Sequence, residues 1–504
     1  MQIKLPEVVH NRISYIGTAI ASLALVVFGF LLILHTLTDA ARAPYASLVI
    51  FIFVPAILLF GAFLIPIGML VERRHVRLTG LHSVPRFPVL DFNDPRQRNL
   101  TALFVVGAIF LLFLSVFGGF QAYETTESIT FCGALCHTVM QPEYTTYQNS
   151  PHARVKCVDC HVGPGAEWYV KSKMSGLYQV YAVTFDKYPR PITGPITSLR
   201  PAQQTCEQCH WPEHFFEAQE RRLIHFLPDE QNTRWQIDLL IKTGGGKPGG
   251  LLRTGGIHWH MNIQNRVEYI ATDKDRLQIP WARMTDTETG AVKEYMSTAG
   301  PLSKEDMAKA TIRKMDCMDC HNRPSHIFRA PSDSVNAALA AGKIDSTLPF
   351  IKKTGVEVLA AEYPSNEAAL SGIANGVNTF YEQNYADVMA KRRAAVNTAV
   401  AELQAIYQHN FFPEMKARWD KYPNNIGHFM FSGCFRCHDG QHQSADGKVI
   451  GKECTLCHTI SAQGKADAMA YAQDPNGLTF EHPEDIGNMW EQMACDACHK
   501  GAAP

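Results

Sequence analysis

The chain has 504 residues, of which 46% are hydrophobic and 19% charged, and its formal net charge is −1. A chain of this length has room for two or more structural regions. The near-zero charge gives no reason to expect a nucleic-acid partner or any strongly charged ligand.

Three uncharged apolar stretches lie in the first 121 residues and predict a transmembrane anchor of three helices. They cover residues 14–35, 45–71 and 100–120. Each is long enough to cross a hydrocarbon core, which needs about 20 apolar residues. The first stretch exceeds the apolar run of about 7–15 residues in a secretory signal peptide, which favours an anchor over a cleaved signal.

The basic residues predict the orientation of this anchor. The loop at residues 72–99 contains six arginines, whereas the loop before the second stretch has only Arg42, beside Asp39. Loops rich in Lys and Arg stay in the cytoplasm. We therefore expect the N-terminus on the cytoplasmic side of a bacterial inner membrane and the chain after Phe120 in the periplasm. His35 and the pair His75 and His82 lie at opposite ends of the spans, so we expect no haem between these helices.

All fourteen cysteines beyond the anchor form seven pairs, and a histidine follows each pair directly. The pairs are Cys132/Cys136, Cys157/Cys160, Cys206/Cys209, Cys317/Cys320, Cys434/Cys437, Cys454/Cys457 and Cys495/Cys498. The histidines are His137, His161, His210, His321, His438, His458 and His499.

This pattern predicts seven covalently bound haems c. In C-x-x-C-H the two thiols bond the porphyrin and the histidine ligates the iron. A disulfide framework does not require the histidines, and structural zinc needs four ligands at a fixed spacing. Haem c is attached outside the cytoplasmic membrane, so residues 122–504 should be periplasmic, which agrees with the charge argument.

The fold class expected for this periplasmic part is mainly α and irregular, with a small β insertion. Residues 122–230 form a loop-rich module with three haem motifs. Residues 231–330 contain the fourth motif and predicted strands at 265–270, 276–283 and 291–296, the last two joined at Thr289-Gly290. Residues 331–425 are predicted to be helical. Residues 426–504 carry three motifs in a compact tail.

One helix is predicted within the cysteine-free segment, at residues 386–408. Val396, Val400, Leu403 and Tyr407 recur there with helical spacing. We interpret this stripe as the packing face of a helix.

A second axial ligand is needed by each low-spin haem, and histidine is the commonest. The candidates near the motifs are His152, His326, His428, His442, His482 and either His258 or His260. This gives six distal ligands for seven haems. His214, His225 and His409 are spare, and the sequence does not assign ligands to individual haems.

The first motif differs from the others. Its spacing, C-G-A-L-C-H, has three residues between the thiols, and Met140 follows His137 by three. Met140 is either the axial ligand of this haem or a packing residue. A thioether ligand raises the reduction potential relative to two histidines. We expect the first haem to be the electron entry and residues 426–504 to form the exit end.

The region from residue 100 to 230 resembles the NapC/NirT/NrfH family of membrane-anchored cytochromes c. A membrane helix leads into the first motif, followed by S-P-H-A-R-V-K-C-V-D-C-H at 150–161 and C-E-Q-C-H-W-P-E at 206–213. The chain departs from that family in having three spans instead of one and seven motifs instead of four or five. The larger design resembles the heptahaem inner-membrane cytochromes of metal-reducing bacteria.

This resemblance implies oxidation of quinol, expected to be menaquinol, near the first haem. The family's quinol-binding lysine corresponds to Lys171 or Lys173, which also have the simpler interpretation of headgroup contacts. Gln179 replaces the family's acidic residue, and Glu143 or Glu167 could take its role. Met140 fits the family's axial methionine, shifted by one position.

Three functions follow from these features. The first is a quinol dehydrogenase that passes electrons to periplasmic cytochromes c or a reductase. The second is an electron-transfer subunit that relies on a partner's quinol site. The third, a terminal oxyanion (nitrite) reductase, is disfavoured because all seven motifs end in histidine. The oligomeric state stays open.

Overall fold

The computed structural model describes residues 9–37, 53–81, 91–163, 165–194, 199–210, 218–244, 256–262 and 264–502. The chain divides into two compact units, one of residues 1–127 with 162–178 and one of residues 128–161 with 179–504. Arg42, Asp39, His82 and Arg86, on which part of the expected topology depends, lie outside the described residues.

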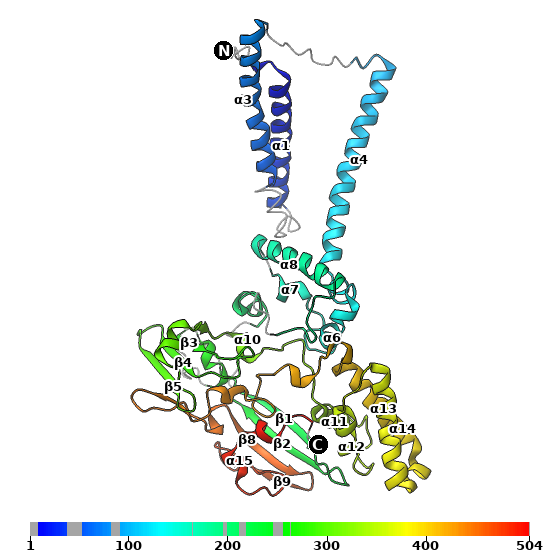
Figure 1. Cartoon of the computed structure of the whole chain (residues 1–504), viewed down its shortest axis with the longest axis vertical. Helices are drawn as coiled ribbons and strands as arrows, with labels where there is room; N and C mark the ends of the chain where they lie inside the picture. The colour runs from blue at the N-terminus through cyan, green and yellow to red at the C-terminus, as the bar shows by residue number, and fades with distance from the viewer. Residues whose placement is uncertain are drawn as a thin grey trace. The chain divides into compact units, whose positions relative to one another are not determined.

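Two long helices of the first unit pack side by side, α1 (Arg12–Leu37) and α3 (Val54–Thr79) (Figure 1). Glycines allow the close approach, because a Cβ atom at Gly17 would lie 2.6 Å from the carbonyl oxygen of Gly61. The Ser14 hydroxyl donates a hydrogen bond to the Ile65 carbonyl across the same interface at 3.0 Å. Small residues at such contacts are typical of helix pairs in membranes.

Two of the predicted spans coincide with helices that are long and apolar enough to cross a membrane. Within the described residues these are Arg12–Leu31 and Val54–Thr79. The third prediction, residues 100–120, falls inside the 32-residue helix α4 (Pro95–Thr126), which is not one of the two. Asp94 caps the start of α4 by accepting a hydrogen bond from the Arg96 amide. Two candidate spans are thus confirmed by length and composition, and the third stays a prediction.

The largest core of the second unit is built by four helices. These are α11 (Pro331–Ala340), α12 (Ile351–Ala360), α13 (Asn366–Asn384) and α14 (Ala386–Asn410). The predicted packing helix is confirmed as α14, which buries Val396, Val400, Leu403 and Tyr407. Helices α13 and α14 lie side by side (Figure 1).

One sheet of the second unit joins strands far apart in the sequence. Its order is β1 (Gln219–Phe226), β2 (Arg234–Ile241), β8 (His458–Lys465) and β9 (Ala468–Tyr471), all antiparallel (Figure 1). Ile241 pairs with His458, so the histidine of the sixth motif begins a strand.

The other sheet is framed by two haem motifs. Its order is β6 (Arg313–Lys314), β3 (Asn265–Ile270), β4 (Trp281–Asp286), β5 (Val292–Ser297) and β7 (His442–Ser444). Edge strand β6 comes just before the fourth motif and edge strand β7 just after the fifth. Tyr269 and Trp281 are almost fully buried in it.

The three predicted strands correspond to β3, β4 and β5, and the turn at Thr289-Gly290 is confirmed by the β4–β5 pairing. Strand β4 begins at Trp281 instead of 276. Arg276 has a left-handed φ of +59°, which ends extended pairing there, and Pro280 has no amide to donate.

The β structure is not confined to the expected insertion. Strands β1, β2, β6, β7, β8 and β9 were not predicted, and the tail at 426–504 contributes to both sheets. Partners in these sheets lie up to about 230 residues apart in the sequence. Pairing at this separation depends on tertiary contacts, which local patterns do not reveal.

Candidate functional site

Motifs two to seven each occupy one short helical turn. These turns are α7 (Cys157–His161), η5 (Cys206–Gln208), α10 (Cys317–Cys320), η10 (Gly433–Arg436), η11 (Cys454–Leu456) and α16 (Cys495–Cys498). In four of them the histidine amide donates to the carbonyl of the first cysteine, for example His321 to Cys317 at 2.8 Å. A turn of this kind presents both thiols and the histidine together, as attachment of one haem requires.

None of the fourteen cysteines forms a disulfide, and each is half-buried or exposed. The thiols of all seven pairs are therefore available for thioether bonds to a porphyrin. A disulfide framework, the alternative for such pairs, is not formed.

Cys136 disagrees with the arrangement expected of an attachment pair, because it does not share one turn with Cys132. Cys132 lies inside helix α5 (Ile129–Ala134), whereas Cys136 lies beyond the end of that helix and is the N-cap residue of α6 (His137–Gln148). Its backbone is non-helical, with φ −101° and ψ 51°, and its carbonyl accepts a hydrogen bond from the Met140 amide at 3.0 Å.

The physical reason is the extra residue in C-G-A-L-C-H, which carries the second thiol past the first turn. Attachment of a haem through Cys136 stays a prediction from the sequence.

Six of the motif histidines each face a second histidine. The pairs are His161 with His326, His210 with His152, His321 with His258, His438 with His260, His458 with His428, and His499 with His482. Their ring centroids lie between 5.9 Å (His152 and His210) and 6.4 Å (His258 and His321) apart.

This spacing matches two imidazoles on opposite faces of one iron. A bond from a metal to an imidazole nitrogen is about 2 Å, and that nitrogen lies about 1 Å from the ring centroid, so the two centroids are about 6 Å apart. The donor set therefore fits covalent haem c with two axial histidines. His152, His326, His428 and His482, expected as distal ligands, all belong to such pairs.

The distal rings are oriented by backbone carbonyls. The Nδ1 atoms of His258 and His326 lie 2.9 Å from the carbonyl oxygens of Thr243 and Glu143. The same type of contact holds His152, His260 and His482. A carbonyl oxygen accepts a hydrogen bond from Nδ1–H, which keeps the proton on Nδ1 and leaves the Nε2 lone pair for a metal. Burial also lowers the pKa of His258, His260 and His326, which favours the neutral, ligating form.

The segment I-H-W-H-M supplies two of these ligands, not one. The 3-10 helix η7 (Ile257–Met261) sets His258 against the fourth motif and His260 against the fifth. Residues two apart on a helix with three residues per turn point about 120° from each other on opposite flanks. The sequence offered these two as alternatives because it does not show that the fourth and fifth motifs meet.

His442 corrects an expectation, because both of its ring nitrogens are already bonded. Nδ1 lies 2.9 Å from Asp439 Oδ1, and Nε2 lies 2.6 Å from the carbonyl oxygen of Ile279. The residue is 1% exposed and begins strand β7. It anchors the fifth motif to the sheet and has no free nitrogen for iron.

Two of the spare histidines, His225 and His409, lie in the described part of the chain and face no motif histidine there. The His225 ring is tilted against Phe429 with the centroids 5.7 Å apart, and burial lowers its pKa to about 4. His409 is exposed on α14. His214 lies outside the described residues.

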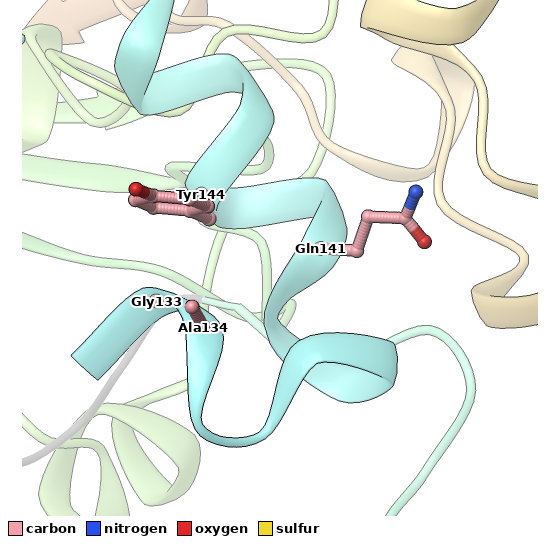
Figure 2. A pocket seen from close by; sticks show the side chains of 4 residues that line it. All are labelled: Gly133, Ala134, Gln141 and Tyr144. Carbon is pink, nitrogen blue, oxygen red and sulfur yellow. The ribbon is translucent and has the colours of Figure 1, made fainter. Parts of the chain in front are cut away.

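The two helices of the first motif, α5 and α6, meet closely at a glycine. Gly133 is required there, because a Cβ atom would overlap the ring of Tyr144. Together with Ala134 and Gln141 these residues line a pocket of about 290 Å³ (Figure 2). Met140 is half-buried on α6, and the side chain of His137 lies outside the described part of the structure.

The three residues expected at the quinol site all lie on α8 (Ala166–Thr184). Lys171 pairs with Glu167 at 2.7 Å, and both are exposed; this contact lowers the pKa of Glu167. Lys173 pairs with Glu127 at 2.9 Å, and the Glu127 side chain is only 6% exposed. Gln179 is exposed on the same helix.

Sequence reasoning missed Glu127, which caps the C-terminal end of α4. The sequence feature that could have pointed to Glu127 is an acidic residue shortly after the apolar stretch at 100–120. Glu143, the other proposed carboxylate, is buried with one oxygen 3.5 Å from His326 Nδ1. Burial raises the pKa of Glu143, while Arg323 and His161 oppose the shift. Glu143 therefore adjoins the ligand pair of the second motif.

Comparison with known proteins supports this description. Residues 95–191 match the N-terminal region of the NapC/NirT cytochrome c family. The cytochrome c-type protein ImcH of Geobacter sulfurreducens is 45% identical over 497 residues, which cover 98% of this chain and 96% of that protein. The cytochrome c-type protein NrfH of Wolinella succinogenes is 35% identical over 78 residues, 15% of this chain and 44% of that protein. No solved structure matches the chain.

Proposed function

This chain belongs to the family of cytochrome c-type proteins that includes ImcH, with a NapC/NirT-type region, and from that premise we propose that it is a quinol dehydrogenase of the bacterial inner membrane. It is a membrane-anchored electron-transport protein with covalent haem c. The proposal adds seven haems, menaquinol as the donor, and periplasmic cytochromes c or a reductase as acceptors.

The observation that carries this proposal is the set of six histidine pairs. Irons with two protein ligands transfer electrons but have no open position for a substrate. This favours an electron-transfer chain over a terminal oxyanion reductase. In the sequence, the first motif alone has three residues between its cysteines, and this difference supports its role as the entry point.

Two further features support an approach of quinol from the bilayer. Helix α4 exposes large apolar side chains along its whole middle, including Leu103, Phe110 and Phe117, as a third span would. Helix α8 exposes an apolar stripe at helical spacing, formed by Val170, Met174, Leu177, Tyr178 and Tyr181. A helix with such a stripe is suited to lie in the membrane interface.

The pair Lys173 and Glu127 is the proposed proton acceptor. Oxidation of one quinol to quinone releases two electrons and two protons, and the electrons leave singly through the haem motifs. When bound, haem c supplies the one-electron acceptor for this reaction. The partly exposed Lys173 can take a proton from the quinol hydroxyl as it gives its own to the buried carboxylate of Glu127. Lys171, in an exposed pair, has no buried base beside it.

Reduction of the purified holoprotein by a menaquinol analogue alone tests this function. We expect the haems to become reduced, and Lys173→Gln to slow the reaction by about 10-fold or more. Lys171→Gln is the matched control and should change the rate by less than about 3-fold, since surface pairs contribute little. Dithionite reports the total haem in each sample.

If dithionite but not the quinol reduces the wild-type haems, the protein is instead a subunit that depends on a partner's quinol site. Rapid reoxidation of the reduced protein by nitrite would favour the reductase.

A further inference from the structure

We propose that the seven haem motifs form a single file in chain order, so that electrons visit them one after another and leave at the seventh motif. This inference rests on the proposed function only for the direction of flow. The order itself rests on contacts between motifs within the second unit.

Contacts between cysteines report contacts between haem edges. Each thiol bonds the periphery of its porphyrin, so two thiols that touch bring two porphyrin edges together. Electron transfer slows steeply as the separation of the edges grows. Neighbouring thiols therefore identify the favoured steps of the path.

The first three motifs connect in order. The side chains of Cys157 and Cys132 lie close together, and the Tyr147 hydroxyl on α6 donates to the carbonyl oxygen of Val155 at 2.9 Å, which holds the segment before the second motif against the helix of the first. His152, five residues before Cys157, faces His210 of the third motif at 5.9 Å, and Cys160 lies within electrostatic range of Cys206 and Cys209.

The third motif meets the fourth through another pair of thiols. The Cys206 and Cys317 side chains lie close together. The turn η4 (Ala202–Gln204), just before the third motif, packs against α10, which carries the fourth.

The fourth and fifth motifs are linked by a buried ionic network. Asp319, inside the fourth motif, accepts hydrogen bonds from Tyr269 at 2.7 Å and from Arg313 at 2.8 Å. Arg436, inside the fifth motif, donates to the carbonyl oxygen of Asp319 at 2.7 Å. Cys320 of the fourth motif neighbours Cys434 of the fifth. The helix η7, which gives one histidine to each motif, spans the same junction.

The last two junctions follow the same rule. Nδ1 of His438, in the fifth motif, lies 2.7 Å from the carbonyl oxygen of Gly451, three residues before the sixth motif, and Cys457 lies within electrostatic range of Cys434. Cys495 of the seventh motif neighbours Cys454 of the sixth, and its Sγ lies 3.9 Å from Nδ1 of His428, the partner of the sixth motif's histidine. Every close thiol pair named here joins consecutive motifs.

Removal of single haems tests the order. The double variants Cys317→Ser/Cys320→Ser, Cys454→Ser/Cys457→Ser and Cys495→Ser/Cys498→Ser lack the fourth, sixth and seventh attachment sites. In a single file, a brief exposure to the menaquinol analogue reduces three, five and six of the six remaining haems respectively. Absorbance gives the number reduced, and electron paramagnetic resonance of freeze-quenched samples shows which ferric signals remain. Dithionite should reduce all six in each variant.

Reduction of four or more haems in the fourth-motif variant, or of all six in the sixth-motif variant, would overturn the single file. The fourth motif carries the buried Asp319, so that variant alone could fail to fold; the sixth- and seventh-motif variants then decide the order. Failure of quinol to reduce the wild type would contradict the proposed function instead. The order is then tested by cryo-electron microscopy of the holoprotein, in which each iron should have the irons of the adjoining motifs as its nearest neighbours.

Discussion

At the scale of single residues, the hydrogen bonds of a histidine decide whether it can ligate iron. His482 and His442 both lie near motifs in the C-terminal tail. His482 contacts a backbone carbonyl through Nδ1 and faces His499 at 6.2 Å, whereas both nitrogens of His442 are bonded within the protein. Proximity to a motif is therefore a weaker criterion than the state of the second ring nitrogen.

This contrast predicts different spectra for two alanine variants. His482→Ala removes an axial ligand and should convert one low-spin haem to high spin. His442→Ala should leave the spin states unchanged and lower the free energy of unfolding by about 1–3 kcal/mol, because buried partners lose their hydrogen bonds. Electron paramagnetic resonance and thermal unfolding measure the two effects. A high-spin signal in His442→Ala would show that His442 does ligate an iron.

Lys352 carries a pH dependence of stability. Its side chain is 1% exposed, its Nζ donates to the carbonyl and the hydroxyl of Ser332 at 2.8 Å, and burial lowers its pKa to about 7 against the opposing effect of Asp333. In the unfolded chain this pKa is about 10.4. Between these values the unfolded state binds more protons, so the free energy of unfolding rises with pH, by up to about 1.4 kcal/mol per pH unit.

Lys352→Met should remove this contribution. The melting temperature of the wild type should rise relative to that of the variant between about pH 7 and 9, and the difference between the two should stop changing below the folded pKa. Unfolding scans of both proteins at several pH values measure it. Parallel pH profiles would show that Lys352 is not the titrating group.

At the scale of elements, the pair α1 and α3 depends on glycines at one position of contact. Gly17 faces Gly61, but Gly29 on the same helix has no atom within 4 Å of an added Cβ. Gly17→Leu should separate the helices and destabilise the pair by about 1–3 kcal/mol. Gly29→Leu is the matched control and should be tolerated. Thermal unfolding in detergent compares them, and equal losses would argue against this packing.

The two sheets show how elements from distant segments hold the motifs. Strands β6 and β7 adjoin the fourth and fifth motifs, and β8 begins at the histidine of the sixth. The β structure therefore serves as a scaffold for three motifs. The β structure is not a self-contained insertion, because strands β7, β8 and β9 come from the tail at 426–504.

At the scale of the whole molecule, the direction of the chain through the membrane sets where electrons enter. A third span inside α4 predicts that residues 72–99 lie in the cytoplasm and the haem motifs in the periplasm. A reporter that is active only in the cytoplasm should be active when fused after residue 85. A reporter that is active only after export should be active when fused after residue 130. The opposite pattern would exclude the three-span anchor.

The sequence by itself determined the chemistry of this protein. Seven Cys-pair-plus-His motifs define haem attachment locally, because the two thiols and the proximal histidine of each haem lie within six residues or fewer. Apolar runs and the helical stripe at Val396 to Tyr407 likewise record their roles in local periodicity. Proximity to a motif also picked out His152, His326, His428 and His482, each of which faces a motif histidine. The widened spacing marked the first motif as different, but the break between Cys132 on α5 and Cys136 at the start of α6 became visible only in the backbone.

Only the tertiary structure decided which histidine faces which motif, and in what order the motifs meet. His152 faces His210, and His258 faces His321, across about 60 residues of sequence in each case. The rejection of His442 and the discovery of Glu127 beside Lys173 depend equally on distant partners. Such contacts arise from the path of the backbone through the whole unit, and no spacing along the chain encodes them.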